Sequence, residues 1–298
     1  MDELSDIRQG LESALGPLGG TPTPLEGGIT NRNYRVTLGG RDYVVRRPGK
    51  ATELLGIDRG GERLASDAAA ALGIAPGVAA VVEGCLVTHF VACNSLQAHE
   101  VAQEAQEIAR LLRRFHDSGV NLPSSFWVGD LLADYAAIVQ QRGGVLPRAY
   151  ATAVGSVERI EAVLLREQPR PAHNDLLSGN IIRAREQGRM MLVDWEYAAM
   201  GDPHFDLGNL SVNNGFGETE NEHLLRAYHE CRPSDRERAI LALMRALSDA
   251  REGAWGVLQA SISELDFDFE RYAEEHFERL QETVGQPAFE EWLAAARA

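Results

Sequence analysis

The chain is 298 residues long, with 44% hydrophobic and 24% charged residues, a composition that is typical of folded globular proteins and excludes a disordered or collagen-like chain. At roughly 150 residues per domain, this length predicts about two units. The 29 Lys and Arg stand against 44 Asp and Glu, a net charge of −15. Such a surface repels a phosphate backbone, so no nucleic-acid partner is expected.

The cysteines and the N-terminus argue against a secreted protein. Cys85, Cys93 and Cys231 form neither an even set nor a metal-ligand spacing, which disfavours a disulfide scaffold or a zinc module. The first residues are acidic, unlike a signal peptide, and no uncharged run reaches the ~20 apolar residues that a membrane span needs. We therefore expect a cytoplasmic protein without a membrane partner. The oligomeric state is left open.

The first 91 residues contain mostly strand-like runs. Strands are expected over 33–38, 42–46, 78–82 and 85–90, and the first two read as a hairpin that turns at Gly39-Gly40. A helix is expected over 58–72, with Asp58 as its N-cap. Gly60 and Gly61 should weaken its first turn by roughly 1 kcal/mol each relative to alanine.

From residue 92 the pattern is mainly helical. Apolar residues recur at helical spacing over 97–116, 131–141, 149–165, 220–228, 235–258 and 269–284. The exception lies between 170 and 194, where a loop leads into strand 180–183, a turn at Gln187-Gly188 and strand 190–193. The change of pattern predicts two units, 1–91 and 92–298.

Polar residues flank this hairpin at positions that suit phosphoryl transfer. That reaction needs a carboxylate to orient and deprotonate the attacking hydroxyl, and oxygen ligands for magnesium on the nucleotide phosphates. Asp175 suits the first role. The hairpin runs out and back, so it should return Asp194 close to Asn180 and place two oxygen ligands near one ion. His173, Asp175 or Asn180 alone could be an ordinary turn residue, but all three together, with a second acidic cluster after the hairpin, favour the catalytic interpretation.

The same stretch resembles a known family. His-Asn-Asp-Leu-Leu-Ser-Gly-Asn at 173–180, Val-Asp-Trp-Glu-Tyr-Ala at 193–198 and Phe-Asp-Leu-Gly-Asn at 205–209 are similar to the aminoglycoside phosphotransferase (APH) and choline/ethanolamine kinase superfamily, within the protein-kinase-like fold. The Asp-Trp-Glu-Tyr sequence favours the choline/ethanolamine kinase branch. The resemblance implies an α/β (α+β) bilobal fold with a small sheet-containing N-lobe, a larger helical C-lobe and ATP in the cleft.

The resemblance also implies roles for these residues. Asp175 and Asn180 would be catalytic, Asn180 and Asp194 would hold Mg²⁺, and His173 and Asp206 would be structural. Asp206 is expected to tie the catalytic loop in place.

The resemblance assigns nucleotide contacts to the N-terminal unit. Paired glycines in 26–34 would let backbone N–H groups approach phosphate oxygens. Val44 and Arg46 share one face of their strand, an apolar contact for adenine beside a cation for phosphate, and the helix after them supplies Glu62 as an ion-pair partner. Arg46 takes the usual lysine role because the single lysine, Lys50, lies beyond that strand. The nucleotide-binding candidates are Gly28, Thr30, Asn31, Val44, Arg46, Glu62, His89 and Phe90, the last two in the hinge strand.

The acceptor implied by the resemblance is a small cationic alcohol, choline or ethanolamine. Carboxylates and aromatic faces bind such ammonium groups, and the candidates are Glu196, Tyr197, Trp255 and Phe267. One departure is Asn213, where eukaryotic choline kinases carry an acid. Another amino alcohol, thiamine or an aminoglycoside-like polycation therefore remains open, as does a catalytically silent binding protein that keeps the fold.

Overall fold

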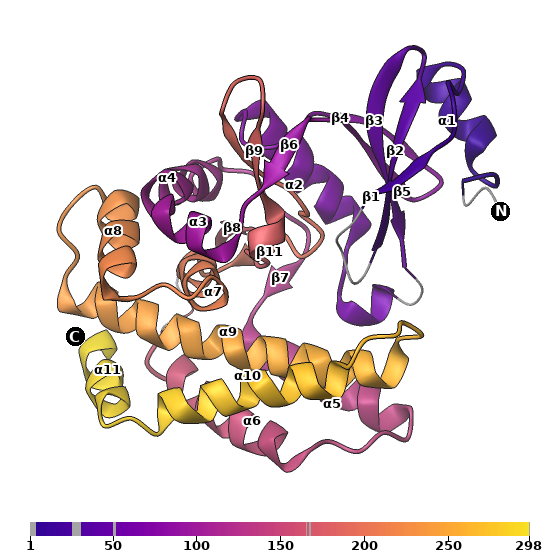
Figure 1. Cartoon of the computed structure of the whole chain (residues 1–298). Helices are drawn as coiled ribbons and strands as arrows, with labels where there is room; N and C mark the ends of the chain where they lie inside the picture. The colour runs from indigo at the N-terminus through magenta and orange to yellow at the C-terminus, as the bar shows by residue number, and fades with distance from the viewer. Residues whose placement is uncertain (1–3, 26–30, 50–51, 165, 167, 298) are drawn as a thin grey trace.

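The computed structural model describes residues 4–25, 31–49, 52–164, 166 and 168–297. It has two lobes (Figure 1): a strand-rich N-terminal lobe and a helical C-terminal lobe. The mixed α/β architecture that the sequence predicted is confirmed.

The N-terminal lobe is built on one antiparallel sheet with strand order β1-β2-β3-β5-β4. Its strands are β1 (Thr23–Leu25), β2 (Asn31–Leu38), β3 (Arg41–Pro48), β4 (Val78–Val82) and β5 (Cys85–His89). Tyr43 and Val45 point from β3 into a small core that also receives Leu11 of α1 (Arg8–Leu15). Because side chains alternate along a strand, Val44 and Arg46 face the opposite side.

The helix α2 (Arg59–Ala71) begins as predicted. The Asp58 side chain accepts hydrogen bonds from the backbone N–H groups of Gly60 and Gly61, at 2.8 and 3.1 Å. These bonds satisfy two donors that a helix start leaves open, which offsets part of the cost of two glycines in the first turn. Further along, Ala65 and Ala69 pack into the core of the C-terminal lobe, so α2 joins the two lobes.

The C-terminal lobe is mainly helical. Its helices are α3 (Ala98–Gln103), α4 (Ala105–His116), α5 (Val128–Gln141), α6 (Arg148–Glu161), α7 (His204–Asn213), α8 (Glu218–His229), α9 (Asp235–Ile262), α10 (Phe269–Val284) and α11 (Ala288–Arg297). Two short three-stranded sheets accompany them: β10 (Met190–Leu192), β9 (Ile181–Ala184) and β6 (Cys93–Ser95); and β7 (Ser125–Phe126), β11 (Ala199–Gly201) and β8 (Arg170–Ala172). Short 3₁₀ turns span Thr52–Leu55 and Ser178–Asn180.

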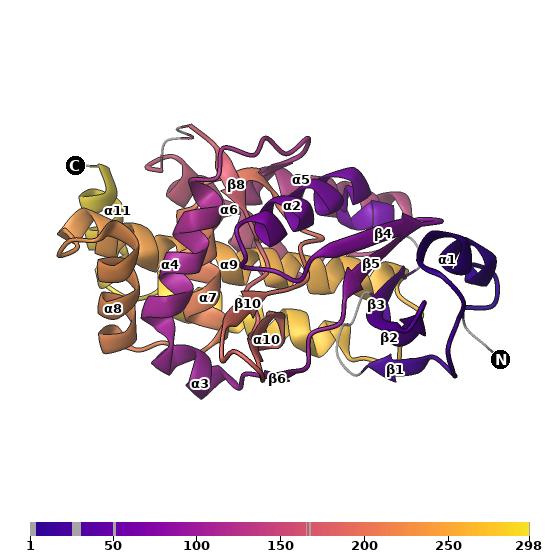
Figure 2. The same ribbon diagram turned by 90° about the horizontal axis from the view of Figure 1, so that it is seen from above.

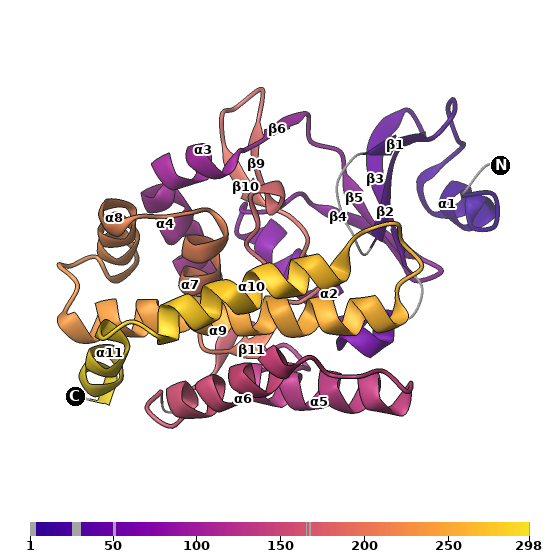
Figure 3. The ribbon, with the colours of Figure 1, turned by 60° about the horizontal axis from the view of Figure 1, so that its bottom comes forward.

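The long helix α9 is the centre of this lobe. It packs against α5, α6, α7, α10 and α11, with α10 alongside it and α5 and α6 below (Figure 3). Close approach to α10 depends on small residues, because a Cβ at Gly253 would stand 2.6 Å from the Phe277 ring. The buried part of α9 thereby reaches the space between the lobes, where Arg251, Glu252 and Trp255 lie.

Several elements differ from the sequence prediction. The helix expected over 97–116 is two helices, since the backbone leaves helical geometry at Glu104, whose carboxylate pairs with Arg183 at 2.8 Å. The helix expected over 149–165 ends at Glu161. The helices α1, α7 and α11 were not predicted, and neither was β8. We propose residue 91 as the lobe boundary, because β6 directly after it pairs with β9 rather than with the N-terminal sheet. In the described part of the chain, no helix is long and apolar enough to cross a membrane.

Candidate active site

A cavity of about 780 Å³ lies between the two lobes. Its wall includes nine of the seventeen predicted site residues: Val44, Arg46, His89, Phe90, Asp175, Asn180, Asp194, Tyr197 and Trp255. They come from β3, β5 and the residue after it, the loop around residue 175, the turn after β10 and helix α9. From above, the N-terminal strands lie at one side of the 170–200 segment, and α9 and α10 lie beneath it (Figure 2).

Asp175 and Asn180 are joined directly. The Asn180 Nδ2 donates to both the backbone O and the carboxylate Oδ2 of Asp175, each at 2.9 Å. The Arg251 guanidinium lies 3.8 Å from the other carboxylate oxygen. Burial raises the pKa of Asp175 well above its usual range, and Arg251 opposes that rise. This loop thus holds a carboxylate in fixed orientation at the cavity wall.

Asp206 anchors the same loop from α7. Its carboxylate accepts hydrogen bonds from the backbone N–H of His173 at 2.8 Å and of Asn174 at 2.7 Å, and it pairs with His116 Nε2 at 2.9 Å. Burial alone would raise the pKa of Asp206, but the bonds from His116 and from His173 hold it below its usual range. Asn174 sits in the left-handed region with φ of 66°, so the loop depends on Asp206 to hold this uncommon backbone.

His173 is buried against the same segment. One ring nitrogen, Nε2, lies 3.0 Å from the carbonyl O of Val193, and the ring packs against Trp195 with centroids 4.5 Å apart. Burial lowers the pKa of His173. This residue therefore connects the loop around 175 to the turn that carries Asp194.

Asp194 follows β10 with φ of 69°, again in the left-handed region. Its carboxylate pairs with Arg46. Burial raises the pKa of Asp194 to about 6 although Arg46 opposes the rise. Arg46 Nη1 also lies 2.9 Å from Glu62 Oε1, and Arg59 pairs with Glu62 at 2.7 Å. The predicted Arg46–Glu62 ion pair is therefore present, and it extends across the cleft to Asp194.

The donor set suits magnesium more than a soft metal. Asn180 and Asp194 both line the cavity and offer amide and carboxylate oxygens, the ligands that Mg²⁺ takes in combination with substrate phosphates and water. Among the described residues, no three His, Cys, Asp or Glu side chains gather to hold a metal on their own. Such a site fits an ion that is shared with a nucleotide.

The far end of the cavity is acidic and aromatic. Trp255 Nε1 donates to the Tyr197 hydroxyl at 2.8 Å, and the Tyr272 hydroxyl donates to Glu252 Oε2 at 2.9 Å. Arg251 donates to Glu252 Oε1 at 2.8 Å and covers the Tyr197 ring, with 4.4 Å from its Cζ to the ring centroid. Burial alone would raise the pKa of Glu252, but Arg251, His276 and the hydrogen bond from Tyr272 together lower it.

Sequence reasoning missed Glu252, Arg251 and Tyr272. Glu252 precedes Trp255 by three residues and so shares its helix face, a signal that was available once Trp255 had been singled out. Tyr272 lies in another helix, α10, and only packing brings it near. Nothing in the local sequence distinguishes Arg251 from a surface arginine.

Two predicted acceptor residues are not among those that line the cavity. Glu196 is buried and directed toward the N-terminal lobe, where its Oε2 accepts from Asn31 Nδ2 at 2.8 Å and pairs with Arg59 at 3.3 Å. Phe267 is 42% exposed and packs on Phe269. The left-handed turn at Asp194 redirects the chain, so Tyr197 reaches the cavity while Glu196 does not.

Two predicted nucleotide contacts have other positions. Asn31 uses its amide to bind Glu196, and Glu62 stands behind Arg46 rather than at the cavity wall. Gly28 and Thr30 lie outside the described residues.

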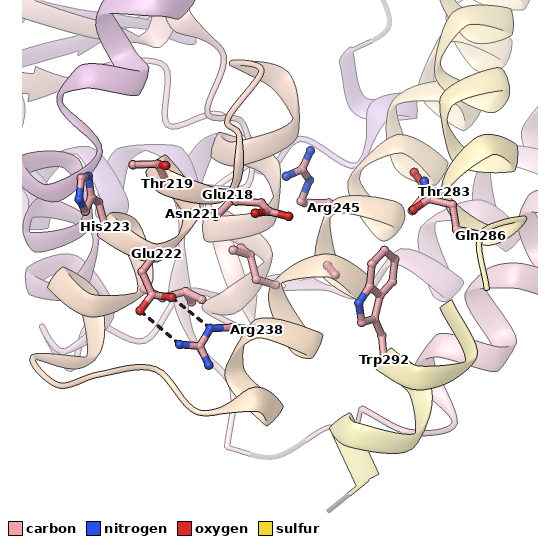
Figure 4. Close-up of a pocket in the computed structure, with 13 residues that line it drawn as sticks. Glu218, Thr219, Asn221, Glu222, His223, Arg238, Arg245, Thr283, Gln286 and Trp292 are labelled. Carbon is pink, nitrogen blue, oxygen red and sulfur yellow. Dashed lines mark hydrogen bonds and ion pairs between the residues drawn. The ribbon is translucent and has the colours of Figure 1, made fainter. Parts of the chain in front are cut away.

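A second cavity of about 730 Å³ lies between α8, α9, α10 and α11. Figure 4 shows Trp292 at one side of it and the Glu222–Arg238 ion pair at the other, with 3.0 Å between Oε2 and Nε. It contains none of the predicted site residues. The candidate catalytic groups therefore gather only in the interlobe cavity, within the described chain.

Several known proteins similar to this chain are named choline or ethanolamine kinases. The chain is 25% identical over 214 residues to Protein LicA of Haemophilus influenzae, a match that covers 68% of this chain and 61% of that protein's length. It is 23% identical to Probable choline kinase 1 of Arabidopsis thaliana, covering 86% of this chain and 84% of that protein.

Solved structures give the same fold over nearly the whole chain. A choline/ethanolamine kinase family protein from Mesorhizobium loti superposes with a TM-score of 0.81 and 29% identity, covering 98% of both chains. The choline kinase LicA from Streptococcus pneumoniae superposes with a TM-score of 0.80 at 24% identity, covering 94% of this chain and 98% of that chain, and at that identity it shows the fold alone. A LicA structure in complex with AMP also has this fold, at 25% identity over 94% of this chain and 97% of that one, with a TM-score of 0.76.

The profile of the phosphotransferase enzyme family (APH) matches residues 21–242. This range runs from before β1 into α9 and includes the cavity residues up to Asn213, whereas Arg251, Glu252, Trp255 and Tyr272 lie beyond it. Because this match covers more than half of the chain, it shows that the chain belongs to the APH phosphotransferase enzyme family.

Proposed function

We propose that this protein transfers the γ-phosphoryl group of ATP to the hydroxyl of a small cationic amino alcohol, choline or ethanolamine. The observation that carries the proposal is the convergence of Asp175, Asn180 and Asp194 in one cavity whose far end is acidic and aromatic. The family and the similar kinases support the same reaction class.

On the nucleotide side, Arg46 would stabilise phosphate charge. It is buried between two carboxylates, Glu62 and Asp194, which raise its pKa and hold the guanidinium in place. Val44 of the same strand face would contact the adenine, and His89 and Phe90 would lie along its edge. Gly28 and Thr30 are proposed to contact the phosphates.

Asn180 and Asp194 would hold Mg²⁺ through side-chain oxygens. When bound with ATP, the ion supplies charge neutralisation for the transferring phosphoryl group. The Arg46–Asp194 ion pair keeps the Asp194 carboxylate at the cavity wall.

Asp175 would orient the acceptor hydroxyl and accept its proton. The hydroxyl oxygen forms the new bond to the γ-phosphorus, the bond from that phosphorus to the β,γ-bridging oxygen breaks, and ADP leaves. Asn180 fixes the Asp175 carboxylate for this role by donating to its Oδ2. Positioning and electrostatics are the main contributions that a protein makes to phosphoryl transfer.

Glu252, Tyr272, Trp255 and Tyr197 would bind the ammonium group. An ionised carboxylate beside aromatic rings attracts a cation by charge and by cation–π contact. The hydrogen bond from Tyr272 holds the Glu252 carboxylate in place. This assignment replaces Glu196 with Glu252 as the acceptor's anionic contact, while Trp255 and Tyr197 keep their predicted roles.

The test is magnesium-dependent ATP consumption against choline, ethanolamine, thiamine and an aminoglycoside. We expect turnover on choline or ethanolamine, and a loss of at least about 10³-fold in kcat for Asp175→Asn, with ADP affinity largely retained. An Asp175→Asn variant with near-normal turnover would contradict the assigned role. ADP binding without turnover on any acceptor would favour a silent binding protein.

A further inference from the structure

A second ion pair connects the two lobes beside the pair of Arg46 and Asp194. Arg59, the first residue of α2, points its Nη1 at Glu196 Oε2 at 3.3 Å. Glu196 follows Asp194 by two residues in the C-terminal lobe, and its side chain is 1% exposed. The same Oε2 accepts from Nδ2 of Asn31, the first residue of β2, at 2.8 Å. One buried carboxylate of the C-terminal lobe thus holds the starts of α2 and β2.

Further contacts fix the Arg59 guanidinium in place for this pair. Its Nη1 also donates to Glu62 Oε2 at 2.7 Å, and its Nη2 donates to Thr52 Oγ1 at 3.1 Å and lies 3.4 Å from Asn31 Oδ1. An exposed arginine loses side-chain entropy when it pairs. Arg59 loses less of it on pairing with Glu196, because its own lobe already orients the planar guanidinium.

The charges of both interlobe pairs form one chain in which the signs alternate. Its order is Asp194, Arg46, Glu62, Arg59 and Glu196, so that each arginine lies between two carboxylates. Buried carboxylates are costly unless they are paired. Glu62 is shared by the two arginines and therefore couples one interlobe pair to the other.

The two interlobe pairs differ in what surrounds them. Arg46 and Asp194 both line the cavity, and the proposed function gives them further tasks at the nucleotide phosphates and at Mg²⁺. Arg59 and Glu196 are not among the residues that line it. Their pair can therefore persist while a nucleotide occupies the cavity.

We propose that Arg59 and Glu196 are positioning residues for the nucleotide. They hold the starts of α2 and β2 against the turn that carries Asp194, and so keep the two walls of the cavity at the separation that binds ATP or ADP. This inference rests on the proposed function for the presence of a nucleotide in the cavity. Without the pair, a smaller fraction of molecules has the lobes in the binding arrangement, and the apparent Kd rises by the same factor.

The test is calorimetric titration of the full chain with ADP at saturating Mg²⁺. If the binding arrangement falls to about a tenth of the molecules, Glu196→Gln and Arg59→Met each raise Kd about tenfold. The double variant should also show about a tenfold rise, because all three proteins lack the same contact. The fitted stoichiometry reports the folded fraction of each preparation.

The sign of the effect separates positioning from simple electrostatics. Glu196→Gln removes a negative charge near an anionic nucleotide, and Arg59→Met removes a positive one. Charge alone would therefore strengthen ADP binding in the first variant and weaken it in the second. The proposed positioning role weakens binding in both.

Arg63→Met is the matched control on the same helix. Arg63 pairs with Asp67 of α2 at 2.6 Å, and both side chains are 45% exposed, so this variant should keep Kd within about twofold of the wild type. Arg59→Lys replaces Arg59→Met if the latter does not fold. It should also weaken ADP binding, since an ammonium group lacks the planar fork that spans Glu62 and Glu196.

Unchanged Kd values in the single variants, opposite signs in the two, or losses that multiply in the double variant would overturn the inference. If the wild type phosphorylates choline or ethanolamine while the variants bind ADP normally, the inference fails and the proposed function stands. If the variants behave as predicted but no acceptor is phosphorylated, the proposed function fails and the positioning role stands. A wild type that does not bind ADP overturns both.

Discussion

Arg46 connects three parts of the active site. It lies on β3, pairs with Glu62 of α2 and pairs across the cleft with Asp194. Its side chain is 10% exposed and that of Glu62 is 3% exposed. Removing one member of such a buried set leaves a charge without compensation, so the network should influence stability as well as nucleotide binding.

We predict that Glu62→Gln lowers the free energy of unfolding by about 2 kcal/mol, the range for a buried hydrogen bond between charged groups. Urea denaturation measures this change. Asp67→Asn is the matched control on the same helix, because the Asp67–Arg63 pair is 45% exposed on both sides and such pairs contribute about 0–1 kcal/mol. Equal decreases in the free energy of unfolding for the two variants would contradict the structural role of Glu62.

Among the elements, α7 determines the conformation of the catalytic loop. Its Asp206 receives two backbone N–H groups and His116, and Asn209 Oδ1 accepts from the Leu176 N–H at 2.6 Å. Both ends of the turn that contains Asp175 are therefore fixed by side chains from one helix. Asp206 does not touch the cavity wall, so its effect on activity is indirect.

We predict that Asp206→Asn destabilises the protein by about 2–3 kcal/mol at pH 7. The pKa of Asp206 is lower in the folded state than the usual ~3.9 of an unfolded aspartate. Its contribution is therefore complete above about pH 4 and is lost as pH falls through the folded pKa. The stability difference between wild type and variant should narrow below about pH 4 in urea titrations. A difference independent of pH would argue against an ionised Asp206.

Substitutions of two helix glycines test how tightly α9 packs against α10. Gly253→Ala should cost about 1–2 kcal/mol, because the new methyl group meets the Phe277 ring at 2.6 Å and overpacking exceeds the gain in helix propensity. Gly155→Ala on α6 meets nothing within 4 Å and should stabilise by about 0.5–1 kcal/mol. Thermal unfolding of both variants measures whether the two changes in stability have opposite signs. A stabilised Gly253→Ala protein would show that the two helices can separate without cost.

In the whole molecule, the interlobe cavity depends on both lobes at once. Val44, Arg46, His89 and Phe90 come from the N-terminal lobe, and the groups proposed for catalysis come from the C-terminal lobe. A nucleotide that binds in this cavity should therefore stabilise the complete fold rather than one part of it.

We predict that ADP with Mg²⁺, at about 100 times its Kd, adds about 2.7 kcal/mol to the free energy of unfolding and raises Tm in a single transition. Removing Mg²⁺ with EDTA should reduce this shift, and Asp194→Asn should abolish the part that depends on Mg²⁺. A shift that is the same with and without Mg²⁺ would contradict the proposed metal ligands.

The sequence predicted the elements whose signals are local. The hairpin of β2 and β3, the Asp58 cap and helices α9 and α10 follow from glycine turns, capping side chains and apolar periodicity. Asp175, Asn180 and Asp194 were found because they flank one short hairpin, and β9 and β10 bring them to one cavity. Short strands and helices such as β8, α7 and α11 were missed, since each is too short to give a clear local signal and is held by tertiary contacts.

The sequence by itself determined the family and the two-lobed fold and predicted the catalytic residues, because motif spacing along a loop and a hairpin is a local property. Only the tertiary structure decided that Glu252, Arg251, Tyr272 and Asn213 line the interlobe cavity and that Glu196 turns toward Asn31 and Arg59. These residues come from helices distant in sequence, and the left-handed turn at Asp194 redirects the chain after it. The packing of the whole lobe determines which face of a helix, or which side of a turn, meets the cavity.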